Sequence, residues 1–309
     1  MSRIVVIGAG AIGGYLAARL YESGRDVVLI SRGERLERLD RDGVSLSRDG
    51  GLRQVRVPVS AHCPQDAAPD HVIVATKTYQ LPDALALLDP YGDAPFNLLT
   101  VQNGVEAPDD AQAAQPRAKV FGGRLHGFFE KQGEVIHHTG VTASLVMGPV
   151  APPAQCGESD QNGAWLASCL RDAVDTTLVS DARPALWDKF LMASTVGAVA
   201  PAFGLTVGQL HGHREARSLL QDSMEEVAFL AAAFGVLLPA DCVTAKLDFI
   251  GAFPPDVTSS LQRDLEARRP SEFAHLTGAI PRFAQQARVP TPRTAKVIEM
   301  LRERRLVSN

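Results

Sequence analysis

The chain has 309 residues, of which 45% are hydrophobic and 21% charged, a composition typical of a globular protein with room for two domains. Its formal net charge of −4, without a long basic run, gives no electrostatic reason to expect a nucleic-acid partner. The four cysteines lack the spacing of a zinc site or a disulfide framework, and a core strand at the very start leaves no room for a signal peptide, so we expect a cytoplasmic protein.

The first predicted elements are a strand, a tight turn and a helix. Residues 4–7 form a continuous β-branched run, which is typical of a strand buried on both faces. The turn that follows consists of Gly8, Ala9, Gly10, Ala11, Ile12 and Gly13. The first glycine permits the turn, the second lets a pyrophosphate approach the backbone, and the third lets the helix pack closely on the strand. With the positive end of the helix dipole at its start, this unit predicts a dinucleotide site; the alternative is a purely structural turn.

The end of the second predicted strand, 27–31, indicates which dinucleotide is bound. NAD-binding folds usually place an acidic residue near this point to hold the ribose hydroxyls. Here the strand ends in Ser31 and Arg32. A hydroxyl and a guanidinium suit a ribose 2′-phosphate, which a carboxylate would repel. We therefore expect NADP, although Glu34 also lies nearby and Arg32 could be a solvated surface arginine.

Strand and helix patterns alternate through the first half of the chain and give way to helices alone after Ser180. Strands are expected at 3–7, 27–31, 72–75, 97–101 and 119–125, hairpin-like additions at 126–150, a helix at 164–172 and a last strand at 176–179. Helices are then expected at 184–200, 206–211, 214–234, 240–250, 257–268, 271–287 and 292–304. The pattern predicts an α/β protein with an N-terminal Rossmann-type doubly wound parallel sheet (1–180, NADP-binding) and a C-terminal all-helical domain (181–309, substrate and catalytic). Glycines, a proline and a glutamine interrupt the apolar stretch 190–210, which favours a buried helix over a membrane span.

Two polar residues follow predicted strands at the sheet edge where open parallel sheets bind ligands. Lys77 comes after strand 72–75, and the alternative is an ordinary surface lysine. Asn103 holds the same relative position after strand 97–101. Its amide could orient a nicotinamide ribose or a substrate carbonyl, but an Asn-Gly pair is also an ordinary turn signal.

Lys189 is the sharpest catalytic candidate, because it opens a run from Phe190 to Leu210 that contains no charged residue. Desolvation lowers the pKa of a lysine and thereby favours proton donation near neutral pH. Hydride delivery to a ketone creates an alkoxide, which an adjacent ammonium would stabilise and protonate. The alternative is a lysine at a helix end whose charged head reaches solvent.

Glu272 is expected on the same helix face as Leu276, Ile280 and Phe283, so its carboxylate should lean toward a core and need a partner. The alternatives are an acid that complements the helix dipole and an ion pair with Arg268. Ser260 would attract no attention by itself. The eight histidines show no metal-ligand spacing, so we expect no metal.

Together these segments resemble the ketopantoate reductase (2-dehydropantoate 2-reductase) family over essentially the whole chain. The matching pieces are the glycine motif 8–13, Lys77-Thr-Tyr-Gln80, Gln102-Asn-Gly104, Trp187-Asp-Lys-Phe190, and Ser259-Ser260 through Ser271-Glu272. The resemblance implies NADPH-dependent reduction of 2-dehydropantoate (ketopantoate) to pantoate, on the route to pantothenate and coenzyme A. By position, it implies Lys189 and Glu272 as catalytic residues, with Lys189 the proton donor. It further implies substrate contacts from Asn103, Lys189, Ser260 and Glu272, cofactor contacts from Lys77 and Asn103, and a 2′-phosphate contact from Arg32.

The chain departs from this family beside the proposed acid. Pantothenate-pathway members usually carry asparagines one and two helical turns after the lysine, where this chain has Ala193 and Gly197. We expect the exchange to enlarge the cleft and make it less polar. The alternatives are a related reductase for a bulkier or less polar 2-keto acid, and a non-catalytic NADP sensor. A homodimer through the helical domain is compatible with the sequence, but no feature demands it.

Overall fold

The computed structural model describes residues 2–48, 51–66, 68–150 and 161–308. Contacts within the chain divide it into two compact units. The sheet unit comprises Met1–Gln102 and Glu106–Ala182, and the helical unit comprises Asn103–Val105 and Arg183–Asn309. The short segment Asn103–Val105 thus belongs to the unit of helices that lie far from it in the sequence.

The sheet unit is built on one sheet, in the order β4-β3-β9-β8-β7-β6-β1-β2-β5, with β10 beside β9. The strands are β1 (Arg3–Ile7), β2 (Asp26–Ile30), β3 (Val44–Arg48), β4 (Gly51–Val55), β5 (Val59–Ser60), β6 (His71–Val74), β7 (Asn97–Thr100), β8 (Lys119–Gln132), β9 (Val135–Pro149) and β10 (Asp175–Leu178). From β5 to β8 all neighbours are parallel, so their carboxyl ends share one edge. The predicted α/β class with a largely parallel sheet is confirmed.

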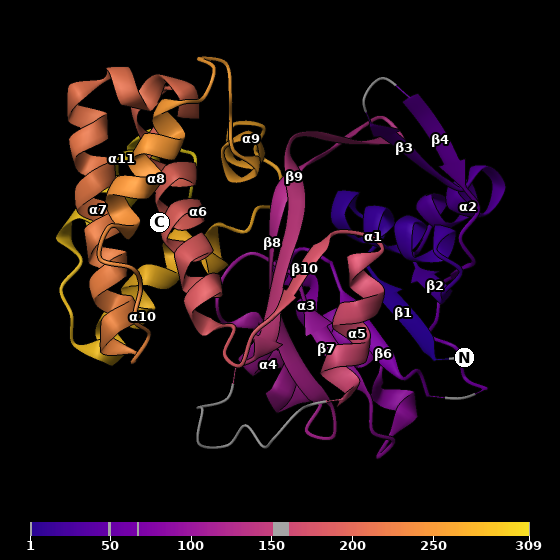
Figure 1. Cartoon of the computed structure of the whole chain (residues 1–309). Helices are drawn as coiled ribbons and strands as arrows, with labels where there is room; N and C mark the ends of the chain where they lie inside the picture. Colours follow the sequence, from indigo (N-terminus) through magenta and orange to yellow (C-terminus); the bar gives the residue numbers. More distant parts are fainter. Residues whose placement is uncertain (1, 49–50, 67, 151–160, 309) are drawn as a thin grey trace. The chain divides into compact units, whose positions relative to one another are not determined.

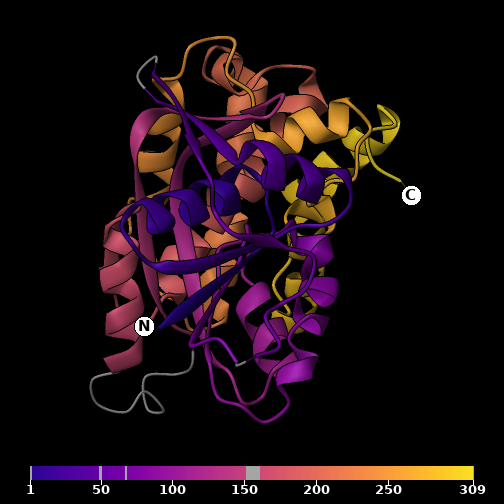
Figure 2. The ribbon, with the colours of Figure 1, turned by 90° about the vertical axis from the view of Figure 1, so that its right-hand side faces the viewer.

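Both faces of β1 are buried, as its β-branched sequence predicts. Ile4 and Val6 belong to one apolar cluster, and Val5 and Ile7 belong to another. Successive side chains of a strand point to opposite faces, so these clusters lie on the two sides of the sheet. Helices cover both (Figures 1 and 2). They are α1 (Ala11–Glu22), α2 (Glu34–Asp42), α3 (Leu81–Ala86), α4 (Ala107–Ala114) and α5 (Gln161–Arg171), with short 3₁₀ turns η1 (Thr78–Gln80) and η2 (Asp89–Tyr91).

The hairpin-like additions expected at 126–150 take the form of one long antiparallel hairpin, β8–β9 (Figures 1 and 2). The pairing shifts between His126 and Phe128. Gly127, at φ +144°, accommodates this shift, and a side chain there would contact the ring of Phe129. The first residues of β9, 135–137, also pair in parallel with β3. The other side of β3 pairs with β4, which forms the edge of the sheet.

The helical unit consists of α6 (Arg183–Phe203), η4 (Val207–Gly212), α7 (Arg214–Ala233), α8 (Cys242–Gly251), α9 (Ser260–Glu266), η5 (Phe273–His275), η6 (Thr277–Ala279), α10 (Ile280–Ala287) and α11 (Pro292–Glu303). The uncharged run that begins at Phe190 lies along α6, which is buried almost continuously to Ala202. The buried carboxylate of Glu226 on α7 accepts hydrogen bonds from the backbone N–H groups of Arg293 and Thr294 at 2.6 and 2.8 Å, and so caps α11. None of the described helices is long and apolar enough to cross a membrane.

The helix expected over 271–287 is wrong in its first half. Residues 273–279 form two 3₁₀ turns that meet at Leu276 (φ −112°, ψ −106°), and the α-helix begins only at Ile280. Pro281 explains the break, because a proline is tolerated in the first turn of a helix but clashes with the preceding turn inside one.

Candidate functional site

Two glycines of the turn between β1 and α1 are required by the protein's own packing. Gly8 has φ +107°, and a Cβ there would lie 2.8 Å from the backbone nitrogen of Thr76, at the end of β6. A Cβ on Gly13 would overlap the carbonyl oxygen of Gly8. Side chains are therefore excluded at both positions by the close approach of strand, turn and helix.

Gly10 is different, because apart from its neighbours in the chain no described atom lies within 4 Å of the position that its Cβ would occupy. Its backbone (φ −70°, ψ −169°) is open to any residue, so neither packing nor strain accounts for a glycine here. Gly10 is the N-cap of α1, where no side chain caps the helix and no acidic residue stands in the first turn. Unsatisfied N–H groups with open space before them form an anion site, so the turn fits a pyrophosphate that lies against the backbone.

The carboxyl end of β2 carries the residues predicted to select NADP. Ser31 is buried, and its N–H donates to the carbonyl of Ser60 at 3.0 Å, which joins the ends of β2 and β5. Arg32 is exposed, and among the described residues no carboxylate pairs with its guanidinium. Arg35 is half-buried; its pKa is lowered by burial, and the charge of Glu134 opposes that shift. Arg32 is thus an exposed cation at the end of β2 that can reach a phosphate.

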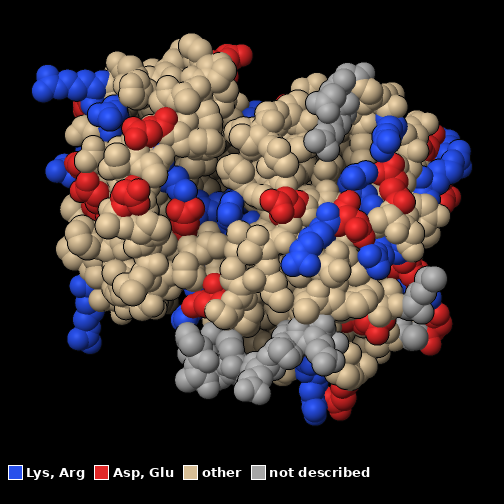
Figure 3. All heavy atoms as spheres, in the orientation of Figure 1, with Lys and Arg blue, Asp and Glu red and all other residues tan. Residues whose placement is uncertain are grey.

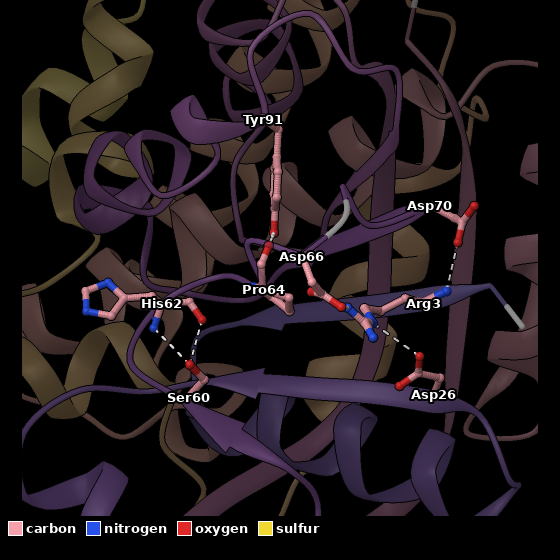
Figure 4. A network of polar contacts seen from close by, with 8 residues as sticks. All are labelled: Arg3, Asp26, Ser60, His62, Pro64, Asp66, Asp70 and Tyr91. Atoms are coloured by element: carbon pink, nitrogen blue, oxygen red, sulfur yellow. Dashed lines mark hydrogen bonds and ion pairs between the residues drawn. The ribbon is translucent and has the colours of Figure 1, made fainter.

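A network of polar contacts lies at the amino ends of β1, β2 and β6. Figure 4 shows Arg3, Asp26 and Asp70 together at one end of β1 and β2, and Ser60 and His62 beyond the other end. Arg3 donates from Nε to Asp26 at 3.2 Å and from its backbone N–H to Asp70 at 2.8 Å. This network ties together the amino ends of β1, β2 and β6, on the edge away from the glycine turn, so we assign it to strand alignment.

Lys77 is the third residue after β6 and is partly exposed, at the carboxyl edge where the sequence predicts it. It is the N-cap of η1, and its backbone N–H donates to Oε1 of Gln80 at 3.3 Å. Beside it, the hydroxyl of Thr76 accepts a hydrogen bond from Nε2 of Gln102 at 3.2 Å. The loops after β6 and β7 are therefore joined within the sheet unit.

Asn103 and Glu272, both predicted site residues, lie together in the helical unit. Nδ2 of Asn103 donates to Oε2 of Glu272 at 3.2 Å across 169 residues of sequence. Glu272 is only 5% exposed, so the expected burial of its carboxylate is correct, and Asn103 is a partner that sequence reasoning missed. Gly104 allows the approach: at φ +101°, a Cβ there would lie 3.1 Å from the carbonyl oxygen of His275.

Lys189 lies on α6 and is partly exposed. The rotation of the helix at this point is fixed by its aromatic neighbours, because Trp187 and Phe190 both pack on Phe283 with ring centroids 5.6 and 5.8 Å apart. The preceding residue, Asp188, accepts from Lys246 of α8 at 2.7 Å. The lysine is thus held beside an apolar core, with a neighbouring carboxylate already paired.

The two positions that follow Lys189 on its helix face do not behave alike. Ala193 is partly exposed, but Gly197 is buried against α9, where a Cβ would lie 3.0 Å from Cβ and Cδ2 of Leu261. The expected enlargement of the site is therefore wrong at Gly197, because Leu261 fills the space. Thr277 adds another contact that the sequence did not reveal, donating from its hydroxyl to the carbonyl of Ser194 at 2.5 Å.

Ser260 is the exposed first residue of α9. The preceding Ser259 caps this helix by accepting from the N–H of Gln262 at 3.0 Å. In the helical unit the structure thus joins Asn103 to Glu272, and it joins the segment that carries Ser260 to α6.

Three cysteines, Cys63, Cys169 and Cys242, are buried free thiols, while Cys156 lies outside the described residues. Burial raises the pKa of Cys63 to about 11, against smaller opposing effects of Tyr91 and Arg32. Among the described residues, no group of three His, Cys, Asp or Glu side chains could hold a metal ion. Figure 3 shows charges of both signs interspersed on the face that it draws, in keeping with the small net charge.

Comparisons with known proteins match nearly the whole chain. The family model "Ketopantoate reductase PanE/ApbA" matches residues 4–152, and "Ketopantoate reductase PanE/ApbA C terminal" matches residues 181–305. A curated 2-dehydropantoate 2-reductase of Mesorhizobium japonicum is 28% identical, with 97% of each chain covered. A crystal structure of a PanE/ApbA family ketopantoate reductase from Ralstonia eutropha superimposes with a TM-score of 0.85 at 27% identity, with 97% of both chains covered.

A more distant structure shares the fold: D-mandelate dehydrogenase, solved with NADH and anilino(oxo)acetate, has a TM-score of 0.84 at 19% identity and covers 97% of both chains. The two family models together span most of the chain and agree with the fold in both units. The chain therefore belongs to the ketopantoate reductase family of oxidoreductases.

Proposed function

We propose that this protein reduces a 2-keto acid to the 2-hydroxy acid with NADPH, and that 2-dehydropantoate, which is reduced to pantoate, is the first substrate to test. The names of the curated relatives support this substrate. The observation that carries the cofactor part is Gly10, a glycine without a packing reason at the uncapped start of α1. Residues 1–180 would hold the cofactor, and residues 181–309 would carry the catalytic groups.

The cofactor would be held by the backbone of residues 8–13 at its pyrophosphate and by Ser31 and Arg32 at its 2′-phosphate. Lys77 and Asn103 would contact its nicotinamide half. When bound, NADPH supplies the hydride. The guanidinium of Arg32 is exposed and pairs with no carboxylate of the described residues. This supports NADP over NAD, because such a cation favours a 2′-phosphate.

Lys189 would donate a proton from Nζ to the keto oxygen of the substrate, where negative charge develops as the carbonyl is reduced. Ser260 and Asn103 can donate hydrogen bonds to substrate oxygens. Glu272 accepts a hydrogen bond from Asn103 and would thereby hold the Asn103 amide in position for the substrate. An ammonium beside the reacting oxygen acts most strongly where the surroundings exclude water, as the apolar core behind Lys189 favours.

The second candidate substrate is a less polar 2-keto acid, and Ala193 favours it, because a methyl group stands one turn after Lys189. The nearby hydroxyls of Ser194 and Thr195 donate to their own helix at 2.6 and 2.7 Å, and that of Thr277 is bound to Ser194. All three are buried, so none is presented to a substrate hydroxyl.

Substitution of Lys189 tests the proposed reaction. Lys189→Ala should lower kcat/KM for the preferred keto acid by roughly 10²- to 10⁴-fold, the usual contribution of a positioned general acid. Its Kd for NADPH, followed by fluorescence titration, should stay near the wild-type value. Lys296→Ala on α11 is the matched control, because that lysine is half exposed and lies 3.9 Å from Glu215. Undiminished turnover by Lys189→Ala would refute the role of Lys189.

A further inference from the structure

Gly197 stands in the middle of α6, where a glycine needs a reason. In a helix interior, glycine is less stable than alanine, because it loses more backbone freedom on folding. Its backbone here is ordinary helix, so no unusual conformation requires it. What requires it is α9, because Cβ and Cδ2 of Leu261 would both lie 3.0 Å from a Cβ at this position. Leu261 is only 4% exposed and thus fills a notch in α6.

A second glycine, Gly208 in η4, allows a close backbone contact with the segment just before α9. A Cβ there would overlap the carbonyl oxygen of Pro254, so the backbones of the two segments touch directly. The N–H of Gly208 donates to the carbonyl of Val257 at 3.3 Å, and the hydroxyl of Thr206 donates to the carbonyl of Pro255. These contacts hold residues 254–257, the segment that leads into α9, against η4.

A third attachment follows Leu261 in the sequence. Gln262 is 1% exposed, and its Nε2 donates to the carbonyl of Leu205 at 2.8 Å, just beyond the end of α6. Residues 254–262 are therefore held at Gly208, Gly197 and Leu205. Ser260 lies between the attachments at Gly208 and Leu205 and is exposed, while the next two residues, Leu261 and Gln262, are buried. The backbone that carries the exposed Ser260 is thus held in place by packing and hydrogen bonds.

We propose that Gly197 is a positioning residue: its notch holds Leu261 and thereby sets the place of Ser260 in the substrate site. This role rests on the proposed function, in which Ser260 contacts the keto acid. A methyl group added at position 197 would lie 3.0 Å from Cβ and Cδ2 of Leu261, closer than ordinary van der Waals contact, so Leu261 must give by a few tenths of an ångström. Because Cβ is bonded directly to the backbone, we expect that displacement to pass to α9 and to Ser260. Because small misplacements of a binding group are costly, KM should rise while the cofactor residues of the sheet unit are untouched.

The test compares Gly197→Ala, Leu261→Ala and the double variant with the wild type. Gly197→Ala should raise KM for the keto acid roughly threefold to tenfold, with Kd for NADPH unchanged and with faster hydrogen exchange in residues 258–264. Adding Leu261→Ala removes Cγ and Cδ2, two of the three atoms nearest to the new methyl group, and should bring KM back toward the wild-type value.

Val297→Ala on α11 is the control for general destabilisation, because Val297 is buried in the same apolar cluster. It should lower Tm without raising KM. Unchanged KM and unchanged exchange in an active Gly197→Ala enzyme would overturn the positioning role alone. If the wild type reduced no 2-keto acid, the proposed function would fail, and the positioning role would fail with it.

Discussion

Two glycines of one turn, Gly10 and Gly13, allow cofactor binding to be separated from folding. In Gly10→Ala the new methyl group points into open space, and φ −70° suits alanine. Alanine caps a helix less well than glycine, at a cost of up to about 1 kcal/mol. It also reduces the entropy of the unfolded chain, which returns about 0.4–1 kcal/mol. The free energy of unfolding should therefore stay within about 1 kcal/mol of the wild-type value.

The same methyl group would stand where a pyrophosphate must approach the backbone. Loss of even one charge-assisted hydrogen bond, about 1.5–3 kcal/mol, would weaken NADPH binding roughly 10- to 100-fold. Gly13→Ala is the matched control, because its methyl group would overlap the carbonyl of Gly8. Overpacking of this kind costs about 1–3 kcal/mol or more, which at roughly 2–4 °C per kcal/mol lowers Tm by several degrees.

The assay is a titration of each variant with NADPH, paired with a thermal melt of the free protein. Gly10→Ala should melt at the wild-type temperature and bind NADPH poorly. Gly13→Ala should show a lower Tm in the absence of NADPH. Wild-type NADPH affinity in a folded Gly10→Ala protein would refute the assignment of the turn to the pyrophosphate. Equal destabilisation by the two substitutions would refute the distinction drawn between them.

Arg32→Ala should raise Kd for NADPH about 10- to 100-fold and leave Kd for NADH nearly unchanged, while Arg35→Ala, whose half-buried guanidinium lies near the charge of Glu134, should affect Tm more than selectivity. Equal losses of NADH and NADPH binding by Arg32→Ala would contradict the phosphate contact. Because burial raises the pKa of Cys63 to about 11, its reactive thiolate is scarce in the folded protein at about pH 8 and grows about tenfold per pH unit toward pH 10. Iodoacetamide labelling mapped by mass spectrometry should follow that rise, and complete labelling of the native protein at about pH 8 would disprove it.

The parts of the fold that the sequence predicts best are those with continuous local signals. The apolar runs of β1, β6 and β7 indicate buried strands without reference to any partner. The edge strand β4 escapes prediction because four of its five residues are exposed, Leu52 by 64%, whereas β3 alternates Val44 and Leu46 with serines over a run too short to stand out. The place of β3 is set by pairing with β9, some ninety residues further along the chain, and β4 in turn pairs with β3; local patterning carries no trace of either partner.

The candidate site divides in the same way. Residues at strand ends, such as Lys77, are found by a local rule about parallel sheets. The pairing of Asn103 with Glu272 and the packing of Leu261 on Gly197 join segments that are far apart in the sequence, so neither could be inferred from spacing. Gly197 did offer a signal, because a glycine inside an otherwise strong helix pattern usually marks a close approach.

The most direct test of the account is NADPH oxidation by the purified protein with a panel of 2-keto acids that includes 2-dehydropantoate and 3,3-dimethyl-2-oxobutanoate, which differ only in the terminal hydroxyl. We predict keto-acid-dependent oxidation, faster with NADPH than with NADH. Preference for 2-dehydropantoate would identify a group that reads the hydroxyl, and preference for its analogue would favour the less polar substrate class. A protein that binds NADPH but oxidises it with none of these acids would contradict the assignment as a 2-keto acid reductase.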